Sequence, residues 1–250
     1  MKVSLLDYTG KGMPDAADYA ARLLIYMKST RLTQGEELQK TIDHMSSANM
    51  EYQLHEVAMS IHSSWEFLWY VFQITGITRA CSLQISRSRY SSIAQQAQRV
   101  ADMSDFETLI PETISSNGKS DVWEKVISTI RWGYQTFRSN GIPAQDARGI
   151  LPNNALTNLA WGMNLNALAA MAAKRDNLRA QGEYANVVRE MKMRVIEVHP
   201  WTKPFLEPER TKTPALDQLL KEQLAGRSPV DAPEINSALK ELDMLKGTWG

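Results

Sequence analysis

The sequence predicts a fold that mixes α-helices and β-strands in one domain, residues 1–203, followed by a charged C-terminal tail, residues 204–250. Three observations support this prediction. Segments with strand-like composition and segments with helical spacing of apolar residues both occur along residues 2–198. Hydrophobic residues make up 43% of a 250-residue chain, which is enough for a substantial core. No internal repeat and no linker-like composition divides this part of the chain.

The N-terminal part is expected to contain one strand and two helices. Residues 2–8, KVSLLDY, are typical of a short strand. Asp15 can cap a following helix, because a carboxylate at this position accepts hydrogen bonds from free backbone amides. Residues 34–45 have the pattern of a second helix. The apolar face expected for the first helix consists of Tyr19, Leu23, Leu24 and Met27.

A second strand is predicted over residues 65–74, WEFLWYVFQI, which are rich in aromatic and β-branched side chains. It should end at Gly76, before a helix that starts at Thr78. The aromatic residues of this strand are expected in the core rather than at a cofactor. They are Trp65, Phe67, Trp69 and Tyr70.

The second half of the domain should begin with a helix over residues 120–138, which Gly141 and Pro143 stop. Residues 154–164 are then predicted as a strand, and residues 165–173 as a helix of small residues. The apolar positions that predict the first of these helices are Trp123, Val126, Ile127, Ile130 and Tyr134.

The last helix of the domain is predicted over residues 181–198 and ends at Pro200. Residues 234–245 of the tail should form a further helix. The apolar stripe of the 181–198 helix consists of Tyr184, Val187, Val188, Met191, Val195 and Val198.

Composition limits the classes of function. Lys plus Arg equals Asp plus Glu, at 28 each, and the pI is near 6.9, so the chain lacks the basic surface of a general nucleic-acid binder. We therefore expect no stable nucleic-acid partner, and any anion site must be local. A single cysteine, Cys81, excludes an internal disulfide framework. With no long apolar run or leader pattern, we expect a cytoplasmic protein with no membrane association.

One local anion site is indicated by residues 84–99, QISRSRYSSIAQQAQR, which lie in a segment, residues 67–101, without any Asp or Glu. Arg87 and Arg89 are two positions apart, so in an extended segment both guanidinium groups would point to one side and could bind a phosphate or pyrophosphate. The alternative is a solvated basic loop.

A second acid-free window, residues 147–175, favours the ligand site over the solvated loop. It contains Arg148, Lys174 and Arg175 and no carboxylate. Two separate groups of cations in acid-free windows are expected to form two walls of one site for an anionic ligand.

The arginine-rich stretch resembles the signature of the flavin-dependent thymidylate synthases, which reads Arg-His-Arg, two residues, Ser, one, Asn, two, Ser, one, Arg. Four of its seven positions match, with Ser88, Ala94 and Ala97 as the departures. The positions that align with the signature are Arg87, Ser88, Arg89, Ser92, Ala94, Ala97 and Arg99.

Further segments resemble the same family in the same order over residues 15–201. Ala20, Ala21 and Arg22 fit an early Ala-Ala-Arg, and HSSWEF carries His62 and Glu66 at the family's His and Glu. Residues 76–84 resemble the family's Gly-Val-Ser-Arg-Ala to Gln segment. The segment GIPAQDARGILPNN places Arg148 on the family's arginine, and WGMN places Asn164 on the family's flavin-contacting asparagine. Arg175 is followed by AQGE and resembles the family's arginine at the uracil.

The resemblance implies a site for each ligand. The implied flavin-binding residues are His62, Arg87, Ser88, Arg89 and Asn164. The implied substrate-binding residues are Gln84, Arg99, Arg148 and Arg175, with Arg175 also as the catalytic residue. The departures at Ser88, Asn166 and Ala170 remove several contacts on the flavin side, so FAD binding is less firmly implied than nucleotide binding.

By the same resemblance, the fold is expected to be α+β, with a mixed antiparallel sheet and surrounding helices, in a homotetramer whose active sites form between subunits. The implied reaction is methylation of dUMP at C5, with FAD as cofactor and NADPH and methylenetetrahydrofolate as co-substrates. Two alternatives stay open. One is a diverged relative that methylates or hydroxymethylates another deoxypyrimidine monophosphate, such as dCMP. The other is a catalytically silent protein that binds nucleotides or single-stranded nucleic acid.

Side-chain chemistry favours uracil at Arg175. Guanidinium has five donors and no acceptor, so it suits a base edge with carbonyl oxygens and disfavours the amino group of cytosine. Glu183 is expected to orient Arg175 or its loop. Cys81 could be a nucleophile, as in the other class of thymidylate synthases, or a small buried hydrophobic residue, and the second is favoured. The spacing of the four histidines does not indicate a metal site.

Overall fold

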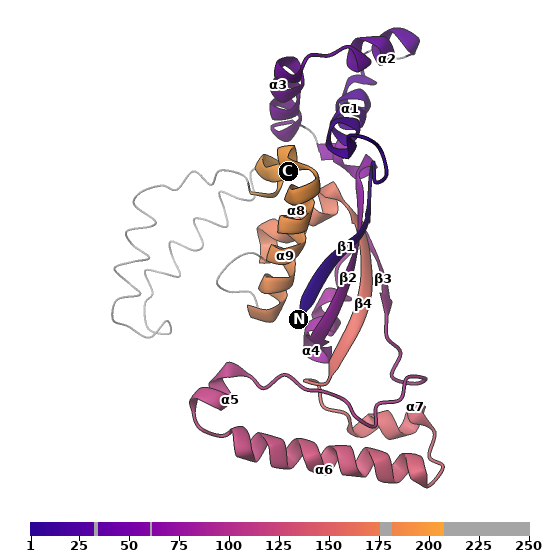
Figure 1. Cartoon of the computed structure of the whole chain (residues 1–250), viewed down its shortest axis with the longest axis vertical. Helices are drawn as coiled ribbons and strands as arrows, with labels where there is room; N and C mark the ends of the chain where they lie inside the picture. The colour runs from indigo at the N-terminus through magenta and orange to yellow at the C-terminus, as the bar shows by residue number, and fades with distance from the viewer. Residues whose placement is uncertain (33–34, 61, 176–181, 208–250) are drawn as a thin grey trace, which may run out of the picture. The chain divides into compact units, whose positions relative to one another are not determined.

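The computed structural model describes residues 1–32, 35–60, 62–175 and 182–207 (Figure 1). Contacts divide the chain into two compact units, Met1–Pro208 and Glu209–Gly250, and the features below all belong to the first. The tail helix predicted over residues 234–245 lies outside the described residues. The domain boundary expected after residue 203 stays a prediction.

A four-stranded sheet is the centre of the unit, in the order β1-β2-β4-β3 with each neighbouring pair antiparallel (Figure 1). The register places Phe72 of β2 opposite both Leu5 of β1 and Trp161 of β4. The predicted α+β class is therefore confirmed. The strands are β1 (Lys2–Tyr8), β2 (Trp69–Thr78), β3 (Ser91–Gln95) and β4 (Leu156–Asn164).

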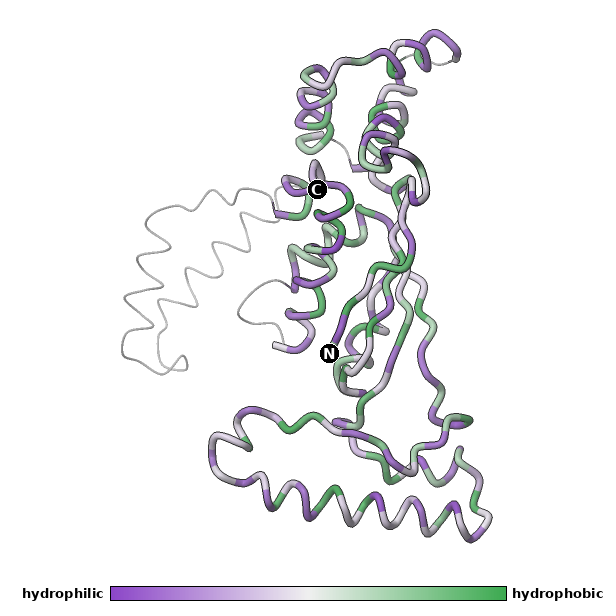
Figure 2. Tube along the Cα trace, viewed as in Figure 1, coloured by the Kyte–Doolittle hydropathy of each residue, from purple (hydrophilic) through white to green (hydrophobic). Residues whose placement is uncertain are grey.

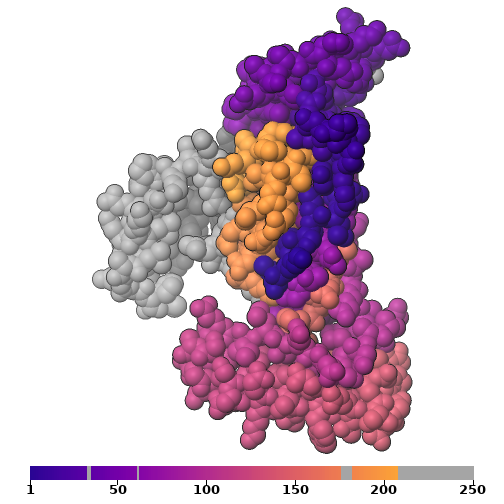
Figure 3. Space-filling model, in the orientation of Figure 1, coloured from indigo at the N-terminus to yellow at the C-terminus, as the bar shows by residue number. Residues whose placement is uncertain are grey.

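One face of this sheet packs against helices α8 (Leu165–Arg175) and α9 (Gly182–Val198) and forms the main core. Alternate residues of β2 point into it, and Tyr70, Phe72 and Ile74 are fully buried. On the face shown in Figure 3, α9 lies beside β1. The predicted stripe of α9 is confirmed, with Tyr184, Val187, Val188, Met191 and Val195 buried.

Three helices precede the central strand: α1 (Ala16–Ser29), α2 (Glu36–Asp43) and α3 (Ser47–Ala58). Asp15 caps α1 as predicted, since its side chain accepts a hydrogen bond from the Asp18 amide at 2.9 Å. The predicted apolar face is partly wrong, because Tyr19 is exposed and Leu23 and Met27 are only half-buried. The residues of α1 that are buried are Ala20, Ala21, Leu24 and Ile25.

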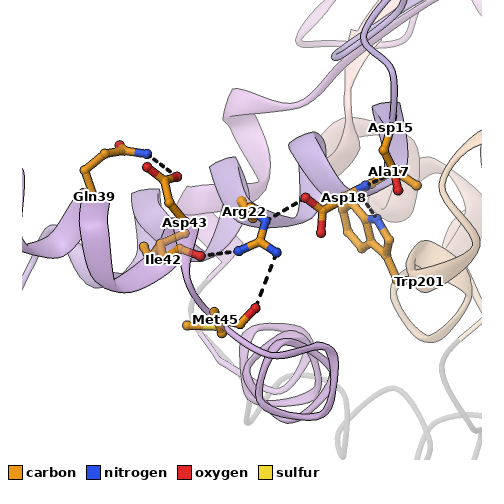
Figure 4. Close-up of polar contacts among 9 residues, drawn as sticks. All are labelled: Asp15, Ala17, Asp18, Arg22, Gln39, Ile42, Asp43, Met45 and Trp201. Atoms are coloured by element: carbon orange, nitrogen blue, oxygen red, sulfur yellow. Dashed lines mark hydrogen bonds and ion pairs between the residues drawn. The ribbon is translucent and has the colours of Figure 1, made fainter.

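Arg22 ties α1 to the end of α2 (Figure 4). Its guanidinium donates to the Asp18 carboxylate at 2.6 Å, to the Ile42 carbonyl, and to the Met45 carbonyl at 3.4 Å. A charged donor that satisfies two carbonyls at a helix end stabilises that end. Arg22 therefore has a structural role in this chain.

The aromatic segment departs from its predicted boundaries. Residues His62–Phe67 form a 3-10 helix, η1, so β2 begins at Trp69 rather than at Trp65. The core assignment holds for Trp65 and Tyr70 and is wrong for Phe67 and Trp69, which are about half exposed. Successive residues of β2 face opposite sides of the sheet, so Trp69 is exposed and Tyr70 is buried. In η1, Trp65 packs into the core and Phe67 faces solvent.

Gly76 bends β2 and does not end it. The residue has φ +68, and the pairing with β4 shifts register between Ile74 and Ile77. The Gly76 amide donates to the Asn158 side chain at 3.0 Å, which satisfies a donor that the ladder leaves free. The strand then continues to Thr78, which caps α4 (Arg79–Ile85).

A second, smaller core forms around α6 (Ser120–Ser139). Hydrophilic and hydrophobic residues alternate along this helix (Figure 2). Ile127 and Tyr134 are buried, whereas Val126 is 52% exposed, so one predicted position of the apolar stripe is wrong. The short segments beside α6 are α5 (Glu112–Ser116), α7 (Ala144–Ala147) and η2 (Arg148–Ile150).

The described part ends with η3 (Pro200–Thr202) and α10 (Lys203–Leu206), after Pro200 has stopped α9 as predicted. Among the described helices, none is both long enough and apolar enough to cross a membrane.

Candidate functional site

A pocket of about 460 Å³ lies between the turn after α4, the end of β4, and helices α8 and α9. Four of its described lining residues are cations and none is acidic. This combination suits an anionic ligand. The cations are Arg87, Arg89, Lys174 and Arg175, and the other lining residues include Ser88, Tyr90, Ser91, Trp161, Met163, Ala170, Met171 and Tyr184.

The arginines of the first wall are presented by a turn, so the extended conformation considered for them is wrong. The helix α4 ends at Ile85, and the amides of Arg87 and Ser88 donate back to the Gln84 and Ile85 carbonyls at 3.2 and 2.9 Å. Tyr90 then adopts a φ of 59, where the chain reverses into β3. Even so, Arg87 and Arg89 both line the pocket.

The second wall is the C-terminal end of α8. Arg175 is the last residue of this helix, and its guanidinium carbon lies 5.0 Å from the centre of the Tyr184 ring. The Tyr184 hydroxyl is 3.0 Å from the Ser88 Oγ. The two acid-free windows of the sequence therefore meet in one pocket, as predicted for Arg87, Arg89 and Arg175.

Several polar groups at the pocket are suited to a bound polar ligand. Burial raises the pKa of Tyr184, against opposing effects of the Ser88 hydrogen bond and the Arg175 charge. Ser91 Oγ and Trp161 Nε1 are buried and have no hydrogen-bond partner within the described part of the chain. Buried polar atoms are normally paired, so unpaired ones in a pocket wall are consistent with a ligand that supplies the partner.

Gln84 and Cys81 lie on α4, before the arginine turn. Gln84 is half-buried and is not among the residues that line the pocket. Cys81 is fully buried, and burial together with the negative charge of Glu183 raises its pKa to about 12. Such a thiol is a poor nucleophile, and this supports the interpretation of Cys81 as a small buried hydrophobic residue.

The structure does not bring His62 and Asn164 into this pocket. The His62 imidazole stacks on Trp65 at 3.9 Å, and burial lowers the pKa of His62. Asn164 Oδ1 accepts a hydrogen bond from the Ala167 amide at 2.8 Å and so satisfies a free donor at the start of α8. Their roles at a flavin stay predictions.

Arg99 and Arg148 are also outside the pocket and lie in the segment between β3 and β4. Arg99 is exposed in the turn that follows β3. Arg148 is exposed at the start of η2, where its Nε donates to the Gln145 carbonyl at 3.2 Å. Their predicted contacts with a substrate phosphate are therefore not formed with the pocket of the same chain.

The described contacts of Glu183 are with Thr78 and not with Arg175, and its expected role at the loop after Arg175 lies outside the described residues. Its carboxylate accepts two hydrogen bonds from Thr78, one from the amide at 2.8 Å and one from the hydroxyl at 2.6 Å. Glu183 thus supports the start of α4, while Arg175 packs on the neighbouring Tyr184. Tyr184 was predicted only as a core position, and the one available signal was a hydroxyl in an otherwise aliphatic stripe.

Across the ranges that the structure describes, no group of three or more His, Cys, Asp or Glu side chains could hold a metal ion.

Comparisons with known proteins agree with the pattern of the sequence. A family model described as "Thymidylate synthase complementing protein" matches residues 4–201. The flavin-dependent thymidylate synthase of Geobacter sulfurreducens is 31% identical over 204 residues, 80% of this chain and 84% of the relative. That of Sulfurisphaera tokodaii is 30% identical over 183 residues, 66% and 71% of the two chains.

A similar fold occurs in a crystal structure of Thymidylate Synthase X from Helicobacter pylori with FAD and dUMP. It has a TM-score of 0.59 and 18% identity, and the match covers 83% of this chain and 99% of that one. At this identity the likeness concerns the fold alone. Together with the family match over most of the domain, these findings show that the chain belongs to the flavin-dependent thymidylate synthase family.

Proposed function

We propose that this chain is an enzyme that methylates C5 of dUMP to give dTMP, with FAD as cofactor and with NADPH and methylenetetrahydrofolate as co-substrates. Membership of the flavin-dependent thymidylate synthase family supports the reaction class. The ligands named for the Helicobacter pylori protein, FAD and dUMP, support the pair of ligands. Methylenetetrahydrofolate and NADPH follow from the resemblance of the signature.

The observation that carries this proposal is the meeting of Arg87, Ser88 and Arg89 with Arg175 in one acid-free pocket. Arg175 lies far from Arg87, Ser88 and Arg89 in the sequence, and each of the four occupies a position that the resemblance assigns to a ligand. Guanidinium groups bind phosphate and pyrophosphate through paired, charge-assisted hydrogen bonds. The donor set therefore fits a flavin dinucleotide or a nucleotide monophosphate.

The residues divide into two roles under this proposal. Arg87, Ser88 and Arg89 would hold anionic and polar parts of FAD, with His62 and Asn164 as further flavin contacts. Arg175 would contact the uracil edge, where five donors meet carbonyl oxygens. The bound flavin supplies the reducing equivalents, and the chain orients the base and stabilises charge on its oxygens.

We further propose that Gln84, Arg99 and Arg148 complete the nucleotide site in a cytoplasmic homotetramer. Arg99 and Arg148 are exposed and do not line the pocket of their own chain, which is compatible with a contribution to the site of another copy. Loss of one charged partner of a phosphate should weaken dUMP binding roughly ten- to a hundredfold.

The test is a reconstitution with purified protein, FAD, NADPH, methylenetetrahydrofolate and dUMP, followed by mass spectrometry of the nucleotide. We expect dTMP only in the complete mixture, with dCMP unchanged in parallel. Calorimetry should show weaker dUMP binding by Arg148→Ala. The matched control is Arg194→Ala, whose guanidinium pairs with Glu190 and Glu197 instead.

The outcomes separate the alternatives. Product from dCMP but not from dUMP would support the diverged relative. A protein that binds nucleotide, takes up no flavin and forms no product would be the silent binder. Either result would refute the proposed reaction.

A further inference from the structure

We propose that Tyr184 is a positioning residue that links the arginine turn to Arg175, so that the two walls of the pocket hold a fixed geometry around the nucleotide. This inference rests on the proposed function, because it concerns how the same pocket selects its substrate. Tyr184 itself is not among the residues that the family signature implies, although the two groups that it contacts, Ser88 and Arg175, are.

The position of Tyr184 is the first argument. It lies in the first turns of α9, is 1% exposed, and is one of the residues that line the pocket. Its ring also contacts Trp161, with centroids 6.4 Å apart. A side chain packed in this way has little rotational freedom, so groups that bind to it share its fixed position.

The ring of Tyr184 holds Arg175. A guanidinium carbon 5.0 Å from the ring centre is within the range of a cation–π contact. Arg175 is exposed at the end of α8, and a long exposed side chain otherwise samples many rotamers. The contact with the ring restricts the guanidinium to the side of the pocket where Arg87 and Arg89 lie.

The hydroxyl of Tyr184 holds the other wall. It lies 3.0 Å from the Ser88 Oγ, and Ser88 is the residue between Arg87 and Arg89. The strand pairing of this segment begins only at Ser91, so the hydrogen bond to Tyr184 is a tertiary contact that restrains the turn at Ser88. Ring and hydroxyl of one buried side chain thus connect the two walls.

Three substitutions distinguish the hydrogen bond to Ser88 from the ring contact with Arg175. Tyr184→Phe keeps the ring and the contact with Arg175 but removes the hydrogen bond to Ser88. Ser88→Ala removes the same hydrogen bond from the half-exposed partner, outside the packed core. Tyr184→Leu removes both contacts.

The expected effects follow from the size of each contact. Loss of one neutral hydrogen bond should raise the dissociation constants for dUMP and for inorganic pyrophosphate on the order of fivefold. Since both single variants break one bond, Tyr184→Phe with Ser88→Ala should be no weaker than either alone. Tyr184→Leu should in addition lose the preference for dUMP over dCMP, because Arg175 is then free to move.

The experiment is calorimetric titration of the full-length protein and its variants, with dUMP and dCMP in the presence of FAD and with pyrophosphate in its absence, together with KM and kcat for dUMP. We expect KM to rise and kcat to change little in Tyr184→Phe. The matched control is Tyr134→Phe in the second core. This change removes a buried hydroxyl that has no hydrogen-bond partner in the described structure. It should bind all three probes like the parent.

Additive effects of the two single variants would overturn the proposal, since they would show that the hydroxyls act separately. It would also be overturned if Tyr184→Phe lowered the thermal midpoint but left all dissociation constants unchanged. If the parent bound pyrophosphate but not dUMP, only the proposed function would be refuted. The pyrophosphate titrations would then still test the role of Tyr184 between the arginine turn and Arg175. A parent that bound neither probe would refute both.

Discussion

His199 makes the stability of this protein depend on pH in the mildly acidic range. The residue is fully buried, and its Nδ1 lies 2.8 Å from the Tyr70 hydroxyl. Its ring also contacts Tyr8 and stacks on Trp201, 5.6 Å away. Burial lowers the pKa of His199 to about 4, against a smaller opposite effect of nearby backbone groups.

The magnitude follows from linkage between protonation and folding. In the unfolded chain a histidine has a pKa of about 6.5, so between pH 6.5 and 4 the unfolded state binds more protons than the folded state. The stabilisation is complete above pH 6.5 and is lost as the pH falls toward 4. The loss approaches about 1.4 kcal/mol per pH unit, which gives about 2 kcal/mol between pH 7.5 and 5.

The assay is urea denaturation at pH 7.5, 6.5, 5.5 and 5, followed by tryptophan fluorescence, for the parent and for His199→Gln. The variant should be less stable at pH 7.5 and should lack this part of the pH dependence. The variant His55→Gln, at an exposed position, controls for the substitution itself. If the parent and His199→Gln lost stability in parallel over this range, the reasoning about His199 would be refuted.

Three further predictions concern single side chains. Asp15→Ala should lower the free energy of unfolding by about 1 kcal/mol in urea denaturation, because the cap on the Asp18 amide is lost. Glu183→Ala should cost about 1.5 to 3 kcal/mol in the same assay, since Thr78 loses an ionised acceptor, and an unchanged stability would contradict this role. Cys81 should react with a disulfide reagent at pH 8 only after unfolding, and Cys81→Ala should keep dTMP formation; rapid labelling of the native protein would argue against the buried thiol.

The elements that the sequence predicts well are those whose own pattern is long. The apolar spacing of α6 and α9 repeats over several turns, and their observed bounds differ from the predicted ones by one residue at most. The prediction missed β3, whose five residues are SSIAQ, and α3, which shows only three buried positions. A short polar strand is held by its pairing with β4, which local composition does not encode.

In the candidate site, too, local features could be predicted from the sequence and contacts between distant residues could not. Arg87, Arg89 and Arg175 could be proposed from the sequence because each belongs to a window without acids, and such a window is a local property of the sequence. The contact of Ser88 with Tyr184 joins residues 96 positions apart, and no local pattern predicts it. The turn at Arg87 was misjudged because a reversal with φ 59 at Tyr90, a non-glycine residue, is uncommon.

The order of strands in the sheet also determines when the chain can fold. The central strand β2 pairs with β4, and its residues Tyr70 and Thr78 hydrogen-bond to residues 129 and 105 positions further along. During synthesis, β2 therefore leaves the ribosome well before its partners and has an unpaired edge and an uncovered apolar face in the meantime. Contacts at such separations slow folding, because long loops must close before burial compensates for the lost entropy. β2 gains its second partner strand only after β4 has been synthesised, and its apolar face is covered only after α9, so this unit folds late in translation and depends on protection of β2 until then.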